Sequence, residues 1–133
     1  MRSKALIIGC SGSELSSDEA RFIAEAKPWG LILFRRNIVD PAQLKALTAH
    51  FRESVGRPNA PVLIDQEGGR VQRMGPPYWR KYPAAAHYLK ACNGNVDEAA
   101  DLARLASRLI AHDLTECGIT VDCMPVLDCP VPW

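Results

Sequence analysis

The chain has 133 residues, of which 47% are hydrophobic and 23% charged, and its 16 basic and 15 acidic side chains give a formal net charge of +1. This composition is typical of a folded globular domain, because a disordered chain has fewer apolar residues and a larger charge imbalance. Proteins that bind nucleic acid through phosphates carry a clear basic excess, so no nucleic-acid partner is predicted. A complete (β/α)8 barrel needs about 250 residues and exceeds this length.

The cysteines indicate a reducing compartment. They are odd in number and form no Cys-x-x-Cys pair, so neither a disulfide framework nor a zinc site is predicted. We interpret them as reduced thiols and expect a cytoplasmic protein without a bound metal. The apolar run at residues 5–10 is too short for a signal peptide, and no stretch approaches the roughly 20 apolar residues of a membrane span, so no membrane partner is predicted.

Apolar runs alternate with helical patterns along the chain, which predicts βα units and a parallel α/β sheet. Strands are expected near residues 4–9, 30–34, 61–65 and 119–124. The first run is continuous rather than alternating, as expected of a buried strand covered on both faces.

Three helices are expected between these strands. Ser16 and Glu19 have the spacing of a capping box, which predicts a helix from there to about residue 26. Asp40, followed by a proline and by Gln43, predicts a second helix that ends at Gly56. The third is expected from about residue 96 to 117, and its predicted inward face consists of Leu102, Ala106, Leu109, Ile110 and Leu114. Residues 66–83 are expected to form a long irregular connection, of the length that is usually functional or disordered.

Ligands of parallel α/β folds bind at the carboxyl ends of the strands, so the residues just past each strand are the candidates for a site. Residues 9–12 contain two glycines but lack a phosphate-binding motif, and a tight turn explains them. Arg36 and Asn37 follow the second strand, where they can reach an anionic or hydroxyl-rich ligand or serve only as a surface arginine and a turn asparagine. Asp122 and Asp128 flank the fourth strand, and Asp128 is equally plausible as a turn residue.

The segment 65–73 is the strongest candidate site. It places two carboxylates, two amides and two guanidinium groups within nine residues, directly after a predicted strand. Gly68 and Gly69 remove side-chain bulk where another group approaches the backbone. Such donors and acceptors can grip a polar ligand from both sides. In a purely structural interpretation, Asp65 caps a turn and pairs with Arg70 or Arg73.

Asp65 and Glu67 could also be interpreted as a catalytic carboxylate pair. Two residues apart in an extended strand, their Cα atoms lie about 6.6 Å apart, which permits the separation needed in a retaining glycosidase. Neighbouring positions on one loop are nevertheless a poor way to flank a sugar ring, so we do not favour this pair. The three histidines have no triad-like partners in the sequence.

Three segments carry a family resemblance. LILFRRN (31–37), IDQEGGRVQR (64–73) and PVLD (125–128) resemble the amino-terminal half of bacterial β-N-acetylhexosaminidases of glycoside hydrolase family 3, and YPAA (82–85) fits the same pattern. The resemblance covers essentially the whole chain. It implies that residues 1–133 are one incomplete domain, about half of a TIM-type barrel. It also implies a retaining hydrolase that removes terminal N-acetylglucosamine from muropeptides during cytosolic cell-wall recycling, without metal or organic cofactor.

The resemblance also implies roles for individual residues. Asp65 matches the family's aspartate that binds hydroxyls of the terminal sugar, and Arg73 matches an arginine that contacts the same sugar. The positions Glu67, Gly68, Gly69 and Arg70 are expected to shape this pocket, together with Arg36, Asn37 and Asp128.

The family's catalytic groups are an aspartate nucleophile and a histidine acid/base paired with an aspartate, all in the carboxyl half of the barrel. The chain is therefore expected to be inactive alone, and to self-associate through its exposed first and fourth strands. The alternative is a non-catalytic α/β module in which Asp65, Arg70 and Arg73 hold a sugar or an anion.

Overall fold

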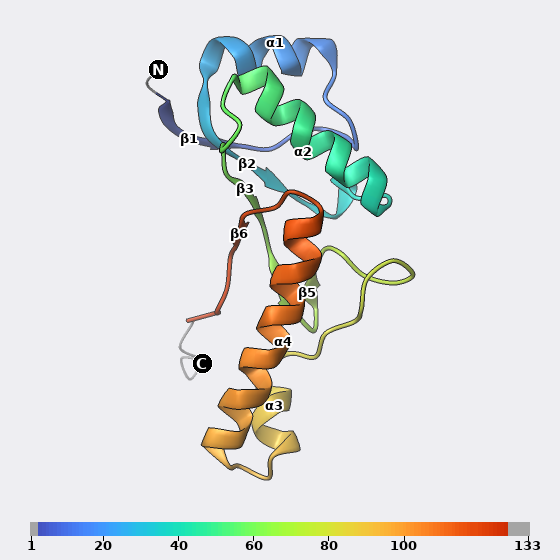
Figure 1. Cartoon of the computed structure of the whole chain (residues 1–133), viewed down its shortest axis with the longest axis vertical. Coiled ribbons are helices and arrows are strands. Elements are labelled where there is room, and N and C mark those ends of the chain that lie inside the picture. The colour runs from blue at the N-terminus through green and yellow to red at the C-terminus, as the bar shows by residue number, and fades with distance from the viewer. Residues whose placement is uncertain (1–2, 128–133) are drawn as a thin grey trace, which may run out of the picture.

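The centre of the molecule is a parallel four-stranded sheet. The structure, a computed structural model, describes residues 3–127. Its sheet has the order β1 (Lys4–Ile8), β2 (Pro28–Leu33), β3 (Val62–Ile64) and β6 (Val121–Asp122), as Figure 1 shows. Every neighbouring pair runs parallel. The predicted parallel α/β class and the positions of all four strands are confirmed, although β6 is shorter than expected.

The strands differ in burial. All three residues of β3 are buried, because β2 and β6 flank it and Val62 and Ile64 belong to the hydrophobic core. The prediction of a buried first strand was wrong, since most of β1 is exposed and the side chains of Leu6 and Ile7 are 39% and 44% accessible. Within residues 3–127, β1 pairs only with β2 and is an edge strand. Its apolar sequence therefore did not show whether its side chains are buried.

The first two helices begin as the sequence predicts. α1 (Ser17–Ala26) has a complete capping box, in which the Ser16 hydroxyl accepts from the Glu19 N–H and the Glu19 carboxylate accepts from the Ser16 N–H. α2 (Pro41–Val55) is capped by Asp40, whose carboxylate accepts from the Gln43 N–H at 2.8 Å. The Gln43 side chain accepts from the Val39 N–H rather than from Asp40. These local bonds satisfy the free N–H groups of each first turn.

The third predicted helix exists, but part of its predicted inward face is wrong. α4 (Val96–Glu116) buries Ile110 and Leu114 against the sheet, whereas Leu102 and Leu109 are 43% and 46% exposed. Figure 1 shows the amino-terminal half of α4, which includes Leu102, extending past the sheet beside the short helix α3 (Ala85–Ala91). A helical periodicity identifies an apolar face without specifying how much of its length is covered.

The connection predicted as irregular contains regular structure. It opens with a small antiparallel hairpin of β4 (Gln66–Gly68) and β5 (Val71–Gln72), and α3 follows it. The sequence prediction missed the hairpin because its strands are two or three residues long. It leads straight on from β3, so the polar segment 65–73 folds back on itself at the carboxyl edge of the sheet (Figure 1).

The four cysteines of the described residues are free. Cys10 and Cys117 are buried, Cys92 is half-buried and Cys123 is exposed, so only some of them act as small apolar core residues. Among residues 3–127, no helix has both the length and the apolar character needed to cross a bilayer.

Candidate functional site

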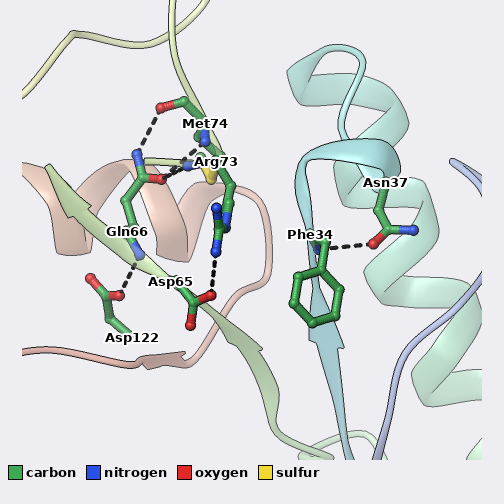
Figure 2. A network of polar contacts seen from close by, with 7 residues as sticks. All are labelled: Phe34, Asn37, Asp65, Gln66, Arg73, Met74 and Asp122. Carbon is green, nitrogen blue, oxygen red and sulfur yellow. Dashed lines mark hydrogen bonds and ion pairs between the residues drawn. The ribbon is translucent and has the colours of Figure 1, made fainter. Parts of the chain in front are cut away.

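An ion pair joins the two ends of the hairpin segment. Asp65 follows β3 directly and Arg73 follows β5, and the Arg73 Nη2 atom lies 2.7 Å from Asp65 Oδ2 (Figure 2). The Arg73 and Asp65 side chains keep 28% and 23% of their surface accessible. Of the two partners that the sequence left open for Asp65, the structure selects Arg73. The pair is therefore ordered by the fold and still reachable from solvent.

Gln66 connects this pair to its surroundings. Its side chain is fully buried, and its Oε1 atom accepts from the backbone N–H groups of Arg73 and Met74. Its Nε2 atom donates to the Met74 carbonyl at 2.8 Å. This amide belongs to the motif but was not among the predicted site residues. The signal in the sequence was a glutamine between a strand and a glycine turn. At such a position its side-chain amide can take the place of backbone hydrogen bonds.

Asp122 lies beneath the hairpin at the end of β6. Its Oδ1 atom accepts from the Gln66 backbone N–H at 2.9 Å, whereas Oδ2 is buried and has no hydrogen-bond partner in the described part of the chain. Burial raises the pKa of Asp122 to about 6, helped by the nearby negative charges of Asp65 and Glu67 and opposed by the Gln66 hydrogen bond. A carboxyl with this environment gains or loses its proton close to neutral pH.

The two motif glycines allow close packing within the chain. Gly68 has φ of 86°, and a Cβ atom there would lie 2.3 Å from the Pro83 carbonyl oxygen. At Gly69, with φ of 62°, a Cβ atom would lie 2.8 Å from the Ala84 Cβ. The group that approaches this backbone is thus the chain's own segment 83–84. The glycines shape the hairpin by allowing its backbone to pack closely against this segment.

Glu67 and Arg70 line a pocket that the ion pair does not border. Together with segment 124–126 they line a surface pocket of about 270 Å³. Its lining residues are Glu67, Gly68, Arg70, Val71, Ala84, Ala85, Met124, Pro125 and Val126. Asp65 and Arg73, the predicted sugar-binding residues, are not among them, whereas Glu67, Gly68 and Arg70 of the predicted pocket-shaping residues are.

The polar residues that follow β2 mainly hold their own loop together. Asn37, in the short helix η1 (Arg35–Asn37), is fully buried; its Nδ2 atom donates to the carbonyls of Cys10 and Gly12, and its Oδ1 atom accepts from the Phe34 N–H. Figure 2 shows Phe34 just past the end of β2 and Asn37 in the turn that follows it. Asn37 supports the strand end rather than offering a free group to a ligand.

Arg36 is exposed, and its Nε atom donates to the Cys10 carbonyl while its guanidinium lies 4.8 Å from the centre of the Phe34 ring. The remaining candidate, Asp128, lies outside the described residues.

Cys123 is a second residue of the site that the sequence analysis did not name. It directly follows β6, is exposed, and lies beside Asp65. Partial burial and the neighbouring Asp65 carboxylate raise the pKa of its thiol. Its position at a strand end was the available signal in the sequence.

The segment after the hairpin is tied to α4. The Tyr82 hydroxyl donates to Asp113 at 2.8 Å, and burial together with that hydrogen bond raises the pKa of Tyr82 to about 12. Gln72 accepts from the Tyr82 N–H and donates to the Arg80 carbonyl. These contacts hold residues 80–82 in place. They thereby also position the adjoining segment 83–84, on which Gly68 and Gly69 pack.

Comparison with known proteins identifies what the chain is similar to. No family model matches it. Beta-hexosaminidases of Alkalilimnicola ehrlichii and Haemophilus ducreyi are 36% and 39% identical to it over 123 residues, which are 92% of this chain and 35% of each relative. The chain resembles the amino-terminal part of the bacterial beta-hexosaminidases. It spans about a third of the length of these relatives.

Solved structures agree with the sequence relatives. NagZ from Neisseria gonorrhoeae in complex with N-trifluoroacetyl-D-glucosamine is 32% identical, with a TM-score of 0.84 over 95% of this chain and 37% of that one. A glycoside hydrolase family 3 beta-N-acetylglucosaminidase from Paenibacillus matches with a TM-score of 0.79 and 31% identity, over 91% of this chain and 22% of that one. The predicted resemblance to this hydrolase family is confirmed.

Proposed function

We propose that this chain supplies part of the sugar-binding site of a retaining β-N-acetylhexosaminidase of glycoside hydrolase family 3. The observation that carries the proposal is the solvent-reachable Asp65–Arg73 pair at the carboxyl edge of the sheet. Its place in a fold similar to NagZ bound to N-trifluoroacetyl-D-glucosamine supports a small carbohydrate ligand. The substrate of the whole enzyme would be terminal N-acetylglucosamine on peptidoglycan fragments, removed in the cytoplasm as part of cell-wall recycling.

The chemistry of the pair suits a sugar. An ionised carboxylate offers about four acceptor positions, and Arg73 occupies one of those on Asp65. The remaining positions can accept from neighbouring sugar hydroxyls, while the guanidinium presents further donors in a fixed plane. Because the ion pair orders both side chains before the sugar arrives, binding loses less conformational freedom. In this proposal Glu67, Gly68, Gly69 and Arg70 shape the hairpin, and no metal or cofactor takes part.

Catalysis is assigned to groups outside the 133 residues. Retaining hydrolysis needs a nucleophile and a positioned acid/base on opposite sides of the scissile bond. In this proposal Asp65, which is paired with Arg73, binds the sugar, and Asp122, whose Oδ1 atom accepts from the Gln66 N–H, supports the hairpin. Residues 1–133 would then form the amino-terminal part of a (β/α)8 barrel, and the catalytic groups would belong to the rest of it.

The exposed strands support self-association of the chain by itself. Leu6 and Ile7 of β1 and Trp29 of β2 border a surface pocket at this edge, and Trp29 is 41% exposed. Unpaired parallel edges and accessible apolar side chains favour pairing between copies. Sedimentation of the 133-residue chain should show concentration-dependent oligomers, and a monomer at all concentrations would contradict this part of the proposal.

Titration of the 133-residue chain with N-acetylglucosamine, followed by NMR, tests sugar binding. Saturable shifts are expected at the hairpin, and Asp65→Ala should abolish them. Asp18→Ala is the matched control, because it removes an aspartate from an exposed ion pair with Arg21 on α1. If the chain were instead an anion-binding module, Asp65→Ala would leave binding of inorganic phosphate intact or stronger, and N-acetylglucosamine would not bind to either form.

A second assay tests whether the catalytic groups lie outside the 133 residues. The 133-residue chain should release no chromophore from an aryl N-acetyl-β-glucosaminide, because the nucleophile and acid/base are assigned elsewhere. Turnover that Asp65→Ala abolishes would place the catalytic groups within the chain and contradict the proposal.

A further inference from the structure

Gln66 is a buried polar residue with every side-chain hydrogen-bonding atom in use. A buried amide without partners is costly, so its three side-chain hydrogen bonds indicate a specific arrangement rather than a tolerated polar side chain. Its neighbours in sequence are Asp65 of the ion pair and Glu67 of the hairpin. What its amide binds therefore bears on the geometry of the site.

The amide takes the place of a missing strand partner. Backbone pairing in the hairpin ends where Gln66 faces Gln72. Beyond that point, Gln66 Oε1 accepts from the Arg73 and Met74 N–H groups at 2.9 and 3.0 Å, and its Nε2 donates to the Met74 carbonyl at 2.8 Å. Figure 2 shows the side chain reaching from the start of β4 to residues 73 and 74. Two consecutive residues after β5 are thus fixed by one side chain.

The same residue is anchored at its own backbone. The Gln66 N–H donates to Asp122 Oδ1 at 2.9 Å, which ties the start of the hairpin to the end of β6. One residue therefore adjoins Asp65 covalently and holds the backbone of Arg73 by hydrogen bonds. Within residues 3–127, the Arg73 side chain has its only hydrogen bond to Asp65, and its Nε atom is buried without a partner. The direction of that side chain depends on where its backbone is held.

We propose that Gln66 is a positioning residue that sets the Arg73 guanidinium against Asp65 for sugar binding. That Arg73 is positioned for sugar binding rests on the proposed function. That Gln66 positions it rests on the three side-chain hydrogen bonds of Gln66. Without the amide, residues 73 and 74 lose the acceptor of both N–H groups, and Arg73 is free to leave Asp65. Small displacements of a binding group lower affinity strongly even when the group itself is intact.

Gln72 provides a matched control. It is also a glutamine of the hairpin with three side-chain hydrogen bonds, to the Met74 and Arg80 carbonyls and from the Tyr82 N–H. None of them involves Arg73. Gln72→Met therefore removes as many bonds from the same segment as Gln66→Met, without releasing the Arg73 backbone. A loss of stability alone would affect both variants.

The test is NMR of the Arg73 guanidinium in the full 133-residue chain, with its signal assigned by its absence in Arg73→Lys. In the wild type, rotation within the ion-paired guanidinium is slowed, and separate Nη hydrogen signals are expected. Gln66→Met should merge them into one averaged signal, whereas Gln72→Met should keep them separate. Separate signals in a folded Gln66→Met chain would overturn the proposal.

A measurement on the wild type keeps the proposal testable if Gln66→Met does not fold. The Arg73 and Met74 N–H groups should exchange with solvent at least tenfold more slowly than unstructured amides, because the Gln66 oxygen accepts from both. Exchange at the unprotected rate would overturn the proposal.

The sugar titration separates this inference from the proposed function. N-acetylglucosamine should bind Gln66→Met about tenfold or more weakly than wild type, and Gln72→Met within about threefold. Wild-type affinity in Gln66→Met would overturn the positioning role. If the wild type binds no N-acetylglucosamine while the Arg73 signals behave as expected, the proposed function fails and the positioning of Arg73 stands.

Discussion

The carboxyl ends of β2 and β3 lie side by side, and both are followed by a run of polar residues that the sequence analysis treated as candidate ligand contacts. After β2, Asn37 is fully buried, and its side chain forms hydrogen bonds with the loop at residues 10–12 and with Phe34. After β3, Asp65 and Arg73 bond to each other and keep about a quarter of their surface accessible. Polar side chains at the ends of parallel strands are thus not equivalent, because burial and hydrogen-bond partners decide which can meet a ligand.

The largest expected effect concerns the buried member of this comparison. Asn37→Ala should lower the free energy of unfolding by about 3 kcal/mol, because the Phe34 N–H loses its acceptor and the carbonyls of residues 10 and 12 each lose a donor. Asp65→Asn should cost less than about 1 kcal/mol, since its ion pair is partly solvated. Urea unfolding of the two variants measures both, and equal losses would erase the contrast between the strand ends.

The second effect concerns the two arginines. Arg73→Ala should weaken N-acetylglucosamine binding more than tenfold, because it removes half of the accessible ion pair. Arg36→Ala should change it less than about threefold, since that side chain bonds the Cys10 carbonyl and stacks on Phe34. Calorimetric or NMR titration provides the affinities. A larger loss with Arg36→Ala would mean that the strand end after β2 meets the sugar directly.

The third effect is a pH dependence beneath the hairpin. The pKa of Asp122 rises from 3.8 to about 6 on folding, so the folded state holds its proton more tightly and stability should fall as pH rises from about 4 to 7. Asp122→Asn cannot ionise and should lose this part of the slope, of order 1 kcal/mol after allowing for partial exposure. Unfolding at several pH values tests it, and parallel profiles for variant and wild type would contradict the assignment.

The smallest effect concerns the exposed thiol beside the ion pair. The Asp65 carboxylate helps to raise the pKa of Cys123, so Asp65→Asn should increase the thiolate fraction and speed its alkylation a few-fold near pH 8. Mass spectrometry of the labelled peptides gives the rate, and Cys92, which is half-buried at the carboxyl-terminal cap of α3, serves as the internal control. An unchanged Cys123 rate in Asp65→Asn would show that the carboxylate does not influence it.

Much of the fold was predictable because its signals are local. The bonds at Ser16 and Asp40 join residues three positions apart, so their spacing predicted two helix starts. The short strands β4 and β5 left no comparable pattern, and the cover of Leu102 depends on how far α4 runs past the sheet. For the site, the motif located Asp65 and Arg73, whereas the supporting role of Gln66 and the place of Cys123 beside Asp65 went unpredicted.

By itself, the sequence determined the alternation of strands and helices, the helix caps and the polar motif that follows the third strand. Only the tertiary structure decided that Asp65 pairs with Arg73 rather than Arg70, and that Asn37 and Gln66 are buried. It also decided that Gly68 and Gly69 make room for Pro83 and Ala84. The physical reason is range: caps and periodicity depend on residues within one or two turns, whereas burial and pairing depend on which distant segment arrives at the same place.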